Sequence, residues 1–166
     1  ADFNAAQELL LRVAPHVRYF HSSQYISDLA NGEICVAVGW SGDILQAAAR
    51  AEEAGNGIEV AYVIPKEGAN LWFDMMAIPA DAPNPEAAHA FINFMIDAQV
   101  AAANTNYVAY PNAVAASNEF IDEEVLNDPT IYPPAETQAN FWTLRPHDSR
   151  TDRMVTRMWT RVRTGQ

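Results

Sequence analysis

The sequence ICVAVGWSGD, residues 34–43, contains the clearest indication of the fold. Its first five residues form a continuous apolar run of strand length, which is typical of a strand in a parallel sheet covered on both faces. Ser41 or Asp43 can cap a helix over the next residues, DILQAAARAEEA, and Gly55 is expected to end it. A buried strand that leads directly into a helix indicates an α/β fold.

The rest of the chain alternates in the same way. Further strands are expected at VRYF (17–20), IEVAYVIP (58–65) and LWFDMMAIP (71–79). Helices are expected at 4–15 with Asn4 as its cap, at 24–30, from Pro85 onward with Asn84 as its cap, at 119–128, and at roughly 149–163. This order predicts an α/β architecture with a largely parallel sheet flanked by helices.

Length and charge exclude some classes of partner. The chain has 166 residues, enough for one domain or for part of a two-lobed protein, and no stretch approaches the ~20 apolar residues that span a bilayer. It begins ADFNAAQ, without an initiator methionine or a leader, so we expect a mature, trimmed or excised piece. The first 142 residues hold four basic residues against 19 acidic ones, a charge that repels nucleic acid and attracts small cations.

Catalytic and metal-binding patterns are missing from the sequence. The four histidines are scattered without the spacing of metal ligands, so no metal site or cofactor is predicted. Ser41 is not a nucleophile elbow, because Asp43 stands where that motif needs glycine. Cys35 is expected to be a small buried hydrophobe. The arginines that recur in the last helix predict a surface face, partly paired with acidic residues elsewhere, rather than an anion site; they are Arg150, Arg153, Arg157 and Arg161.

Two tryptophan–aspartate pairs are better candidates for a site. Trp40 ends the apolar run and Asp43 begins a helix, and ligands of open α/β sheets bind where strands end. In LWFDMMAIP, alternation places Trp72 and Asp74 on one face of a strand. A carboxylate in apolar surroundings needs a partner, and an external ammonium group would supply one while also attracting an indole face. Core aromatic residues with capping aspartates explain the same spacing, so both interpretations stay open at this point.

Several longer stretches carry a family resemblance. VRYFHSSQYISDLANGEICVAVGWSGD, IPKEGANLWFDMMAIP and IYPPAET closely resemble the carboxyl-terminal half of the periplasmic polyamine-binding proteins, which are the putrescine and spermidine receptors of bacterial ABC importers. The likeness runs from about residue 8 to the end. In that family a GW-x-GD motif, a (W/F)-x-D motif and a further tyrosine line the ligand cleft. The matching ligand-binding positions here are Trp40, Asp43, Trp72, Asp74 and Tyr110, with Tyr107 as the alternative tyrosine.

The resemblance implies a type II solute-binding fold, whose two lobes close on the ligand. By this analogy residues 1–73 and 112–166 belong to the second lobe, and residues 74–111 return to the first. The expected partners are a polyamine, an ABC permease in the inner membrane, and a missing amino-terminal half of the same protein. Trp72, where some family members carry phenylalanine, favours spermidine or mixed specificity.

The sequence therefore predicts a periplasmic binding protein for a linear polyamine, not an enzyme. Two alternatives stay open: a binding protein of the same fold for another cationic or amino-containing solute, and a ligand-dependent regulatory partner of a membrane protein. Enzymatic activity is the third alternative, and it lacks a nucleophile, a base or a metal set.

Overall fold

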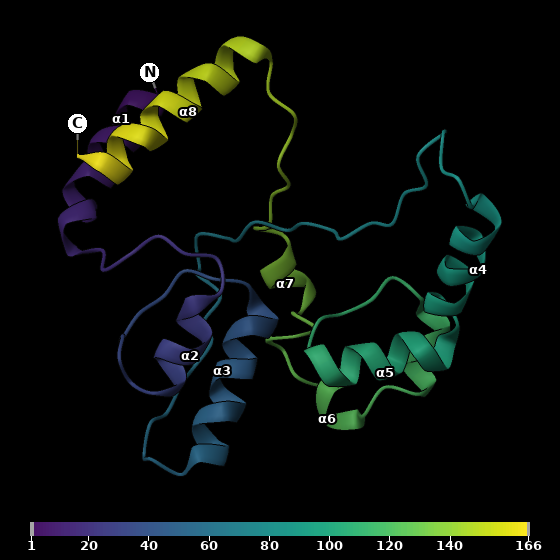
Figure 1. Ribbon diagram of the computed structural model, residues 1–166. Coiled ribbons are helices and arrows are strands. Elements are labelled where there is room, and N and C mark those ends of the chain that lie inside the picture. The colour runs from purple at the N-terminus through teal and green to yellow at the C-terminus, as the bar shows by residue number, and fades with distance from the viewer. Residues whose placement is uncertain (1, 166) are drawn as a thin grey trace. The chain divides into compact units, whose positions relative to one another are not determined.

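The computed structural model describes residues 2–165 and consists of helices joined by long extended segments (Figure 1). The chain divides into two compact units, residues 1–22 with 144–166 and residues 23–143. No helix among the described residues is long and apolar enough to cross a membrane.

The first unit is a pair of helices from the two ends of the chain. Helix α1 (Asp2–Val13), followed by the 3₁₀ turn η1 (Ala14–His16), packs beside α8 (Ser149–Thr164), as Figure 1 shows. Val162 is buried in this unit, and the rings of Phe20 and Trp159 meet edge to face at 5.0 Å. Asn4 lies inside α1 rather than at its cap, since the helix already begins at Asp2.

The second unit contains the larger core. Helices α2 (Gln24–Ala30) and α3 (Ser41–Ala54) pack together through Tyr25, Leu29, Ile44 and Ala47. The extended segments that follow each helix add Ile34, Ala37, Val60 and Tyr62 to this core. Burial of these apolar side chains is the main stabilising contribution to such a core.

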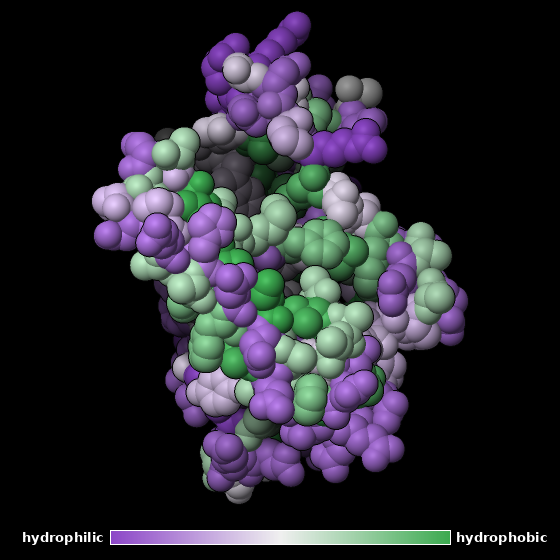
Figure 2. All heavy atoms as spheres, turned by 90° about the vertical axis from the view of Figure 1, so that its right-hand side faces the viewer, coloured by the Kyte–Doolittle hydropathy of each residue, from purple (hydrophilic) through white to green (hydrophobic). Residues whose placement is uncertain are grey.

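The remaining helices of this unit are shorter. They are α4 (Pro85–Met95), α5 (Ala98–Val108), η2 (Ala115–Glu119), α6 (Glu123–Leu126) and α7 (Ala135–Gln138). Asp97 begins α5 by accepting hydrogen bonds from the Gln99 and Val100 amides. Phe91 and Phe94 of α4 are more than half exposed. Figure 2 shows the side where α4 and α5 lie, with apolar side chains gathered at its centre and hydrophilic ones around them.

The predicted parallel sheet is not present among residues 2–165. The backbone there has one isolated parallel bridge, between Asn70 and Trp142, where the Leu71 amide donates to the Trp142 carbonyl oxygen at 2.8 Å. The apolar run of residues 34–38 has no regular secondary structure, with a bend at Cys35, and Val36 is 85% and Val38 101% exposed. A strand becomes buried on both faces only when neighbouring strands carry covering helices, and no described segment forms a ladder beside this run.

The expected burial of Cys35 is wrong for the same reason. Cys35 lies at a bend in this unpaired run, and its thiol is free and exposed. An apolar neighbourhood in sequence buries a side chain only when other chain segments pack against it.

Candidate functional site

The start of α3 presents Asp43 toward two tyrosines. The residue at the N-cap of α3 is Trp40, whose side chain makes no capping bond, so the expected cap by Ser41 or Asp43 is wrong. Asp43 is the third helical residue, where the helix dipole favours a carboxylate. Its oxygens are taken up by side-chain donors rather than by the amides of the first turn.

Both carboxylate oxygens of Asp43 accept hydrogen bonds from phenols. The Tyr25 hydroxyl donates to Oδ2 at 2.6 Å, and the Tyr110 hydroxyl lies 3.4 Å from Oδ1. The Tyr25 oxygen also accepts a hydrogen bond from the Trp40 amide at 3.3 Å. No lysine, arginine or histidine of the described residues forms an ion pair with Asp43, so its charge has phenol partners and no cationic one.

The phenols remain donors over the physiological pH range. Burial, with the hydrogen bond to Asp43, holds the pKa of Tyr25 well above its usual range. Burial and the Asp43 charge raise the pKa of Tyr110 to about 12. An ionised carboxylate offers roughly four acceptor positions, and the two phenols use two of them. The Asp43 carboxylate therefore retains capacity for a further donor.

Two glycines make this arrangement possible. A Cβ at Gly42 would lie 2.5 Å from the Val108 carbonyl oxygen and against the Tyr110 ring. A Cβ at Gly39 would lie 2.7 Å from two ring carbons of Tyr25. Both distances are far below van der Waals contact, so the GWSGD stretch needs a residue without a side chain at each position.

The two predicted tryptophans lie against each other at a tilt, and Trp40 also lies near the ring of Tyr25. The ring centroids of Trp40 and Trp72 are 5.9 Å apart with 38° between the planes, and those of Trp40 and Tyr25 are 6.5 Å apart. Such offset aromatic contacts are favourable by about 0.5–1.5 kcal/mol beyond the area they bury. Trp40 is 37% and Trp72 49% exposed, so neither side chain is buried in the core.

The chain after Tyr110 is held by a buried polar network. The Asn112 amide nitrogen donates to the hydroxyls of Thr105 and Ser117, at 2.9 Å in each case. Thr105 is 1% and Ser117 0% exposed. Just before Tyr110, α5 ends at Ala109 in the left-handed region, with φ 55°. This network fixes the turn from which Tyr110 reaches Asp43.

Asp74 and Tyr107 lie apart from these contacts. Asp74 is exposed, and no hydrogen bond or ion pair from the described residues reaches its carboxylate. Tyr107 is 86% exposed, whereas Tyr110 is partly buried against Asp43. Of the five predicted ligand-binding residues, the structure thus connects Trp40, Asp43, Trp72 and Tyr110 through contacts, and it leaves Asp74 without one.

Sequence reasoning missed Tyr25 and the two glycines. Tyr25 lies in the short helix α2, 18 residues before Asp43, and nothing in QYISDLA marks its hydroxyl as part of a site. The available signal was GWSGD itself, since glycines at 39 and 42 leave room for rings from elsewhere to approach.

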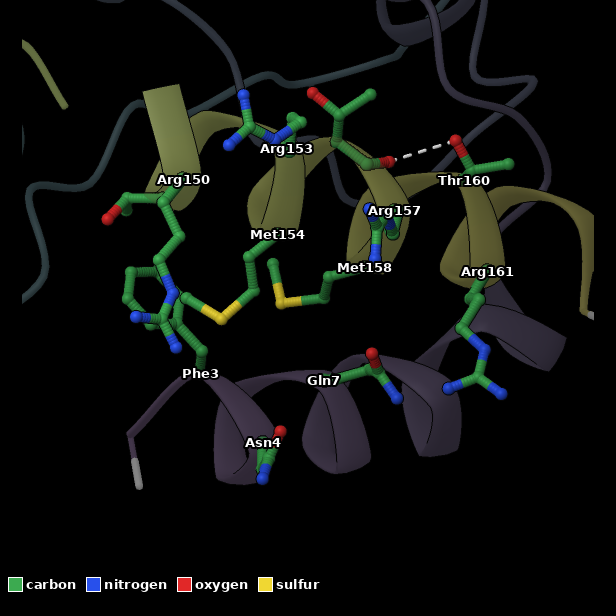
Figure 3. Close-up of a pocket in the computed structure, with 12 residues that line it drawn as sticks. Phe3, Asn4, Gln7, Arg150, Arg153, Met154, Arg157, Met158, Thr160 and Arg161 are labelled. Carbon is green, nitrogen blue, oxygen red and sulfur yellow. Dashed lines mark hydrogen bonds between the residues drawn. The ribbon is translucent and has the colours of Figure 1, made fainter. Parts of the chain in front are cut away.

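A groove in the first unit has a positively charged lining, opposite in sign to the Asp43 carboxylate. It lies between α1 and α8, has a volume of about 1120 Å³, and is lined mainly by arginine and methionine side chains of α8. Figure 3 shows Met154 and Met158 pointing toward α1, with Arg150 and Arg161 near the two ends. The four arginines of α8 are exposed, as predicted, but the partial pairing expected for them is not seen, since none pairs with a carboxylate of residues 2–165. A cationic lining repels ammonium groups, so this groove is not a candidate site for a cation.

Comparisons with known proteins identify the family. A family model for bacterial extracellular solute-binding proteins matches residues 3–133. The putrescine-binding periplasmic protein PotF of Escherichia coli is 50% identical over 97% of this chain and 44% of its own length. The putrescine-binding periplasmic protein SpuD of Pseudomonas aeruginosa is 50% identical over 99% of this chain and 45% of its own. The chain therefore spans about half the length of the curated relatives it matches.

Solved structures agree with this assignment. A spermidine/putrescine ABC transporter structure from Listeria monocytogenes has a TM-score of 0.81 at 30% identity, over 98% of this chain and 48% of that one. The substrate-binding protein PotD of Streptococcus pneumoniae has a TM-score of 0.70 at 28% identity, over 94% of this chain and 46% of that one. With the family match over most of its residues, the chain belongs to the bacterial extracellular solute-binding proteins.

Proposed function

We propose that the whole protein binds a linear polyamine, putrescine or spermidine, in the periplasm and delivers it to the permease of an ABC importer. The relatives support this proposal, because those at 50% identity are named putrescine-binding periplasmic proteins. More distant relatives are named spermidine/putrescine-binding periplasmic proteins. These are binding proteins, so no bond is formed or broken in this role.

One observation in the site carries the proposal. The Asp43 carboxylate, partly buried beside Trp40 and Trp72, has hydrogen-bond donors but no cationic partner from the described residues. A ligand ammonium would supply the missing charge and would be attracted by the indole faces by roughly 0.5–2 kcal/mol. Hydrogen bonds between charged groups add about 1.5–3 kcal/mol.

Each of the five predicted residues then contacts a different part of the ligand. Asp43 neutralises one ammonium group and Asp74, whose carboxylate is exposed and unpartnered in the described residues, neutralises another. Trp40, Trp72 and Tyr110 pack against the methylene chain between the charges. With residues 1–73 and 112–166 in one lobe and 74–111 in the other, closure of the lobes would bring both carboxylates to one ligand.

Isothermal titration calorimetry on the full-length protein, with its amino-terminal half present, tests this function. We expect binding of putrescine or spermidine and no comparable binding of arginine. Asp43→Asn and Asp74→Asn should each weaken polyamine binding on the order of tenfold to a hundredfold, because each removes one charge partner. Glu53→Gln, an exposed change on the same helix as Asp43, is the matched control and should leave affinity unchanged. If neither polyamine binds measurably, or if only arginine binds, the proposal is rejected in favour of another amino-containing solute.

A further inference from the structure

We propose that Tyr25 of α2 is a positioning residue that sets the orientation of the Asp43 carboxylate for the ligand ammonium, an inference that rests on the proposed function. Tyr25 does not belong to either tryptophan–aspartate motif. Its side chain reaches the site from a different helix, through the core of the second unit.

The phenol oxygen of Tyr25 connects the two parts of the site. It donates to Asp43 Oδ2 at 2.6 Å and accepts from the Trp40 amide at 3.3 Å. One atom thus joins the carboxylate to the backbone of the residue that provides the indole wall. Any displacement of this oxygen would change the distance between the charge and the aromatic surface.

The ring that carries this oxygen cannot easily move. Tyr25 is 3% exposed and belongs to the cluster of buried residues with Leu29, Ile44 and Ala47. On another side it lies against the backbone of Gly39, where even one added carbon would clash with its ring. Because close-packed interiors hold side chains in single rotamers, the position of the Asp43 carboxylate is determined by the packing of α2 against α3.

The two carboxylate oxygens are not equivalent as a result. Oδ2 has the short bond to the buried Tyr25, whereas Oδ1 has only the long 3.4 Å contact to the partly buried Tyr110. A short hydrogen bond to a carboxylate is the stronger one. Tyr25 therefore anchors Oδ2 and leaves Oδ1 as the oxygen that meets the ammonium group.

Replacing Tyr25 by phenylalanine removes the hydroxyl group that donates to Asp43 and keeps the aromatic ring. Measured by calorimetry on the full-length protein, Tyr25→Phe should weaken polyamine binding on the order of tenfold, because Asp43 loses its short bond and its fixed rotamer. Tyr62→Phe is the matched control, since Tyr62 packs against the same cluster without bonding Asp43. Tyr62→Phe should leave affinity unchanged.

A double-mutant cycle separates positioning from general loss of structure. If Tyr25 acts through Asp43, Tyr25→Phe should have little further effect on affinity once Asp43→Asn is present. Equal affinities of Tyr25→Phe and Tyr62→Phe, or additive losses with Asp43→Asn, would overturn this inference. Neither of those results would contradict the proposed function, which is rejected only if the unaltered protein binds neither polyamine.

An NMR measurement keeps the inference testable if Tyr25→Phe fails to fold. In the unaltered protein the Tyr25 hydroxyl proton, buried in a short bond to a carboxylate, should give a downfield signal that shifts when putrescine is added. The positioning role would be contradicted if the chemical shift of this proton stayed the same at a saturating concentration of a polyamine whose binding calorimetry has shown.

Discussion

The two tryptophan–aspartate pairs look alike in sequence but are supported very differently. In the first pair, Asp43 lies in the first turn of α3 and accepts hydrogen bonds from two phenols, 18 and 67 positions away in the sequence. In the second, Trp72 and Asp74 lie in an extended, exposed segment whose nearest backbone pairing is the bridge at Asn70. The difference shows that a motif specifies which groups are available, whereas its rigidity comes from side chains that lie far away in the sequence.

The largest difference between the pairs should appear in stability. Gly42→Ala should lower the free energy of unfolding by about 3 kcal/mol, because its Cβ would collide with backbone at Val108 and with the Tyr110 ring. Phe73→Ala, at a position that is 64% exposed in the second pair, should cost less than about 0.5 kcal/mol. Urea denaturation of the two variants compares the regions directly. Equal losses would show that the second pair is as tightly packed as the first.

The turn behind Tyr110 should give the next largest effect. Asn112→Ala leaves the buried hydroxyls of Thr105 and Ser117 without their amide donor and should cost about 2 kcal/mol. Asn106→Ala is the control, since Asn106 accepts a single exposed bond from the Asp122 amide and should cost about 0.5–1 kcal/mol. Thermal unfolding measures both variants. Matching losses would mean that the polar network does not hold the first pair in place.

A pH dependence should distinguish the first pair from the second. The folded pKa of Tyr110 is about 12, above its ordinary value of about 10. Because folding favours the protonated phenol, its stabilising contribution is complete below about pH 10 and is lost as pH rises toward 12. Urea midpoints measured across this range should fall less steeply in Tyr110→Phe. The exposed Tyr107→Phe should retain the full slope, and an unchanged slope in both variants would contradict the Tyr110–Asp43 contact.

The smallest effect concerns the chain leading into the first pair. Cys35 is exposed in the apolar run before Trp40, so a thiol reagent should label it in the native protein nearly as fast as in urea. This prediction concerns the exposure of the thiol and not the free energy of unfolding. Strong native protection would show that a strand or helix covers the run, as the apolar pattern of residues 34–38 predicts.

Local features of the fold could be predicted from the sequence. The segment QYISDLA forms α2, α3 ends at Gly55 in the left-handed conformation, and α8 begins where predicted, with Asp148 at its cap. These signals act within a few residues. The predicted sheet needs ladders between distant segments, and the exposure of Val36 and Val38 shows that apolar character alone does not place a strand beside another.

The site was partly predictable for a related reason. Trp40, Asp43 and Trp72 were indicated by their spacing and by the family resemblance, and Tyr110 by the resemblance alone. Both signals identify residues without their distances. The sequence also suggested Asp43 as a helix cap, and the structure shows phenols competing for the same oxygens. Tyr25 could not be found in this way, because its role depends on how α2 packs against α3.

Ala109 offers a further lesson for anyone who wishes to engineer this protein. Among residues 2–165 it is the non-glycine residue with a positive φ, and such a conformation costs an L-residue about 1–2 kcal/mol. Ala109 lies immediately before Tyr110, so the surrounding contacts hold it in the left-handed region against its preference for a negative φ. Glycine at this position would remove that cost, and Ala109→Gly should raise the thermal unfolding midpoint without altering any of the five candidate ligand-binding side chains.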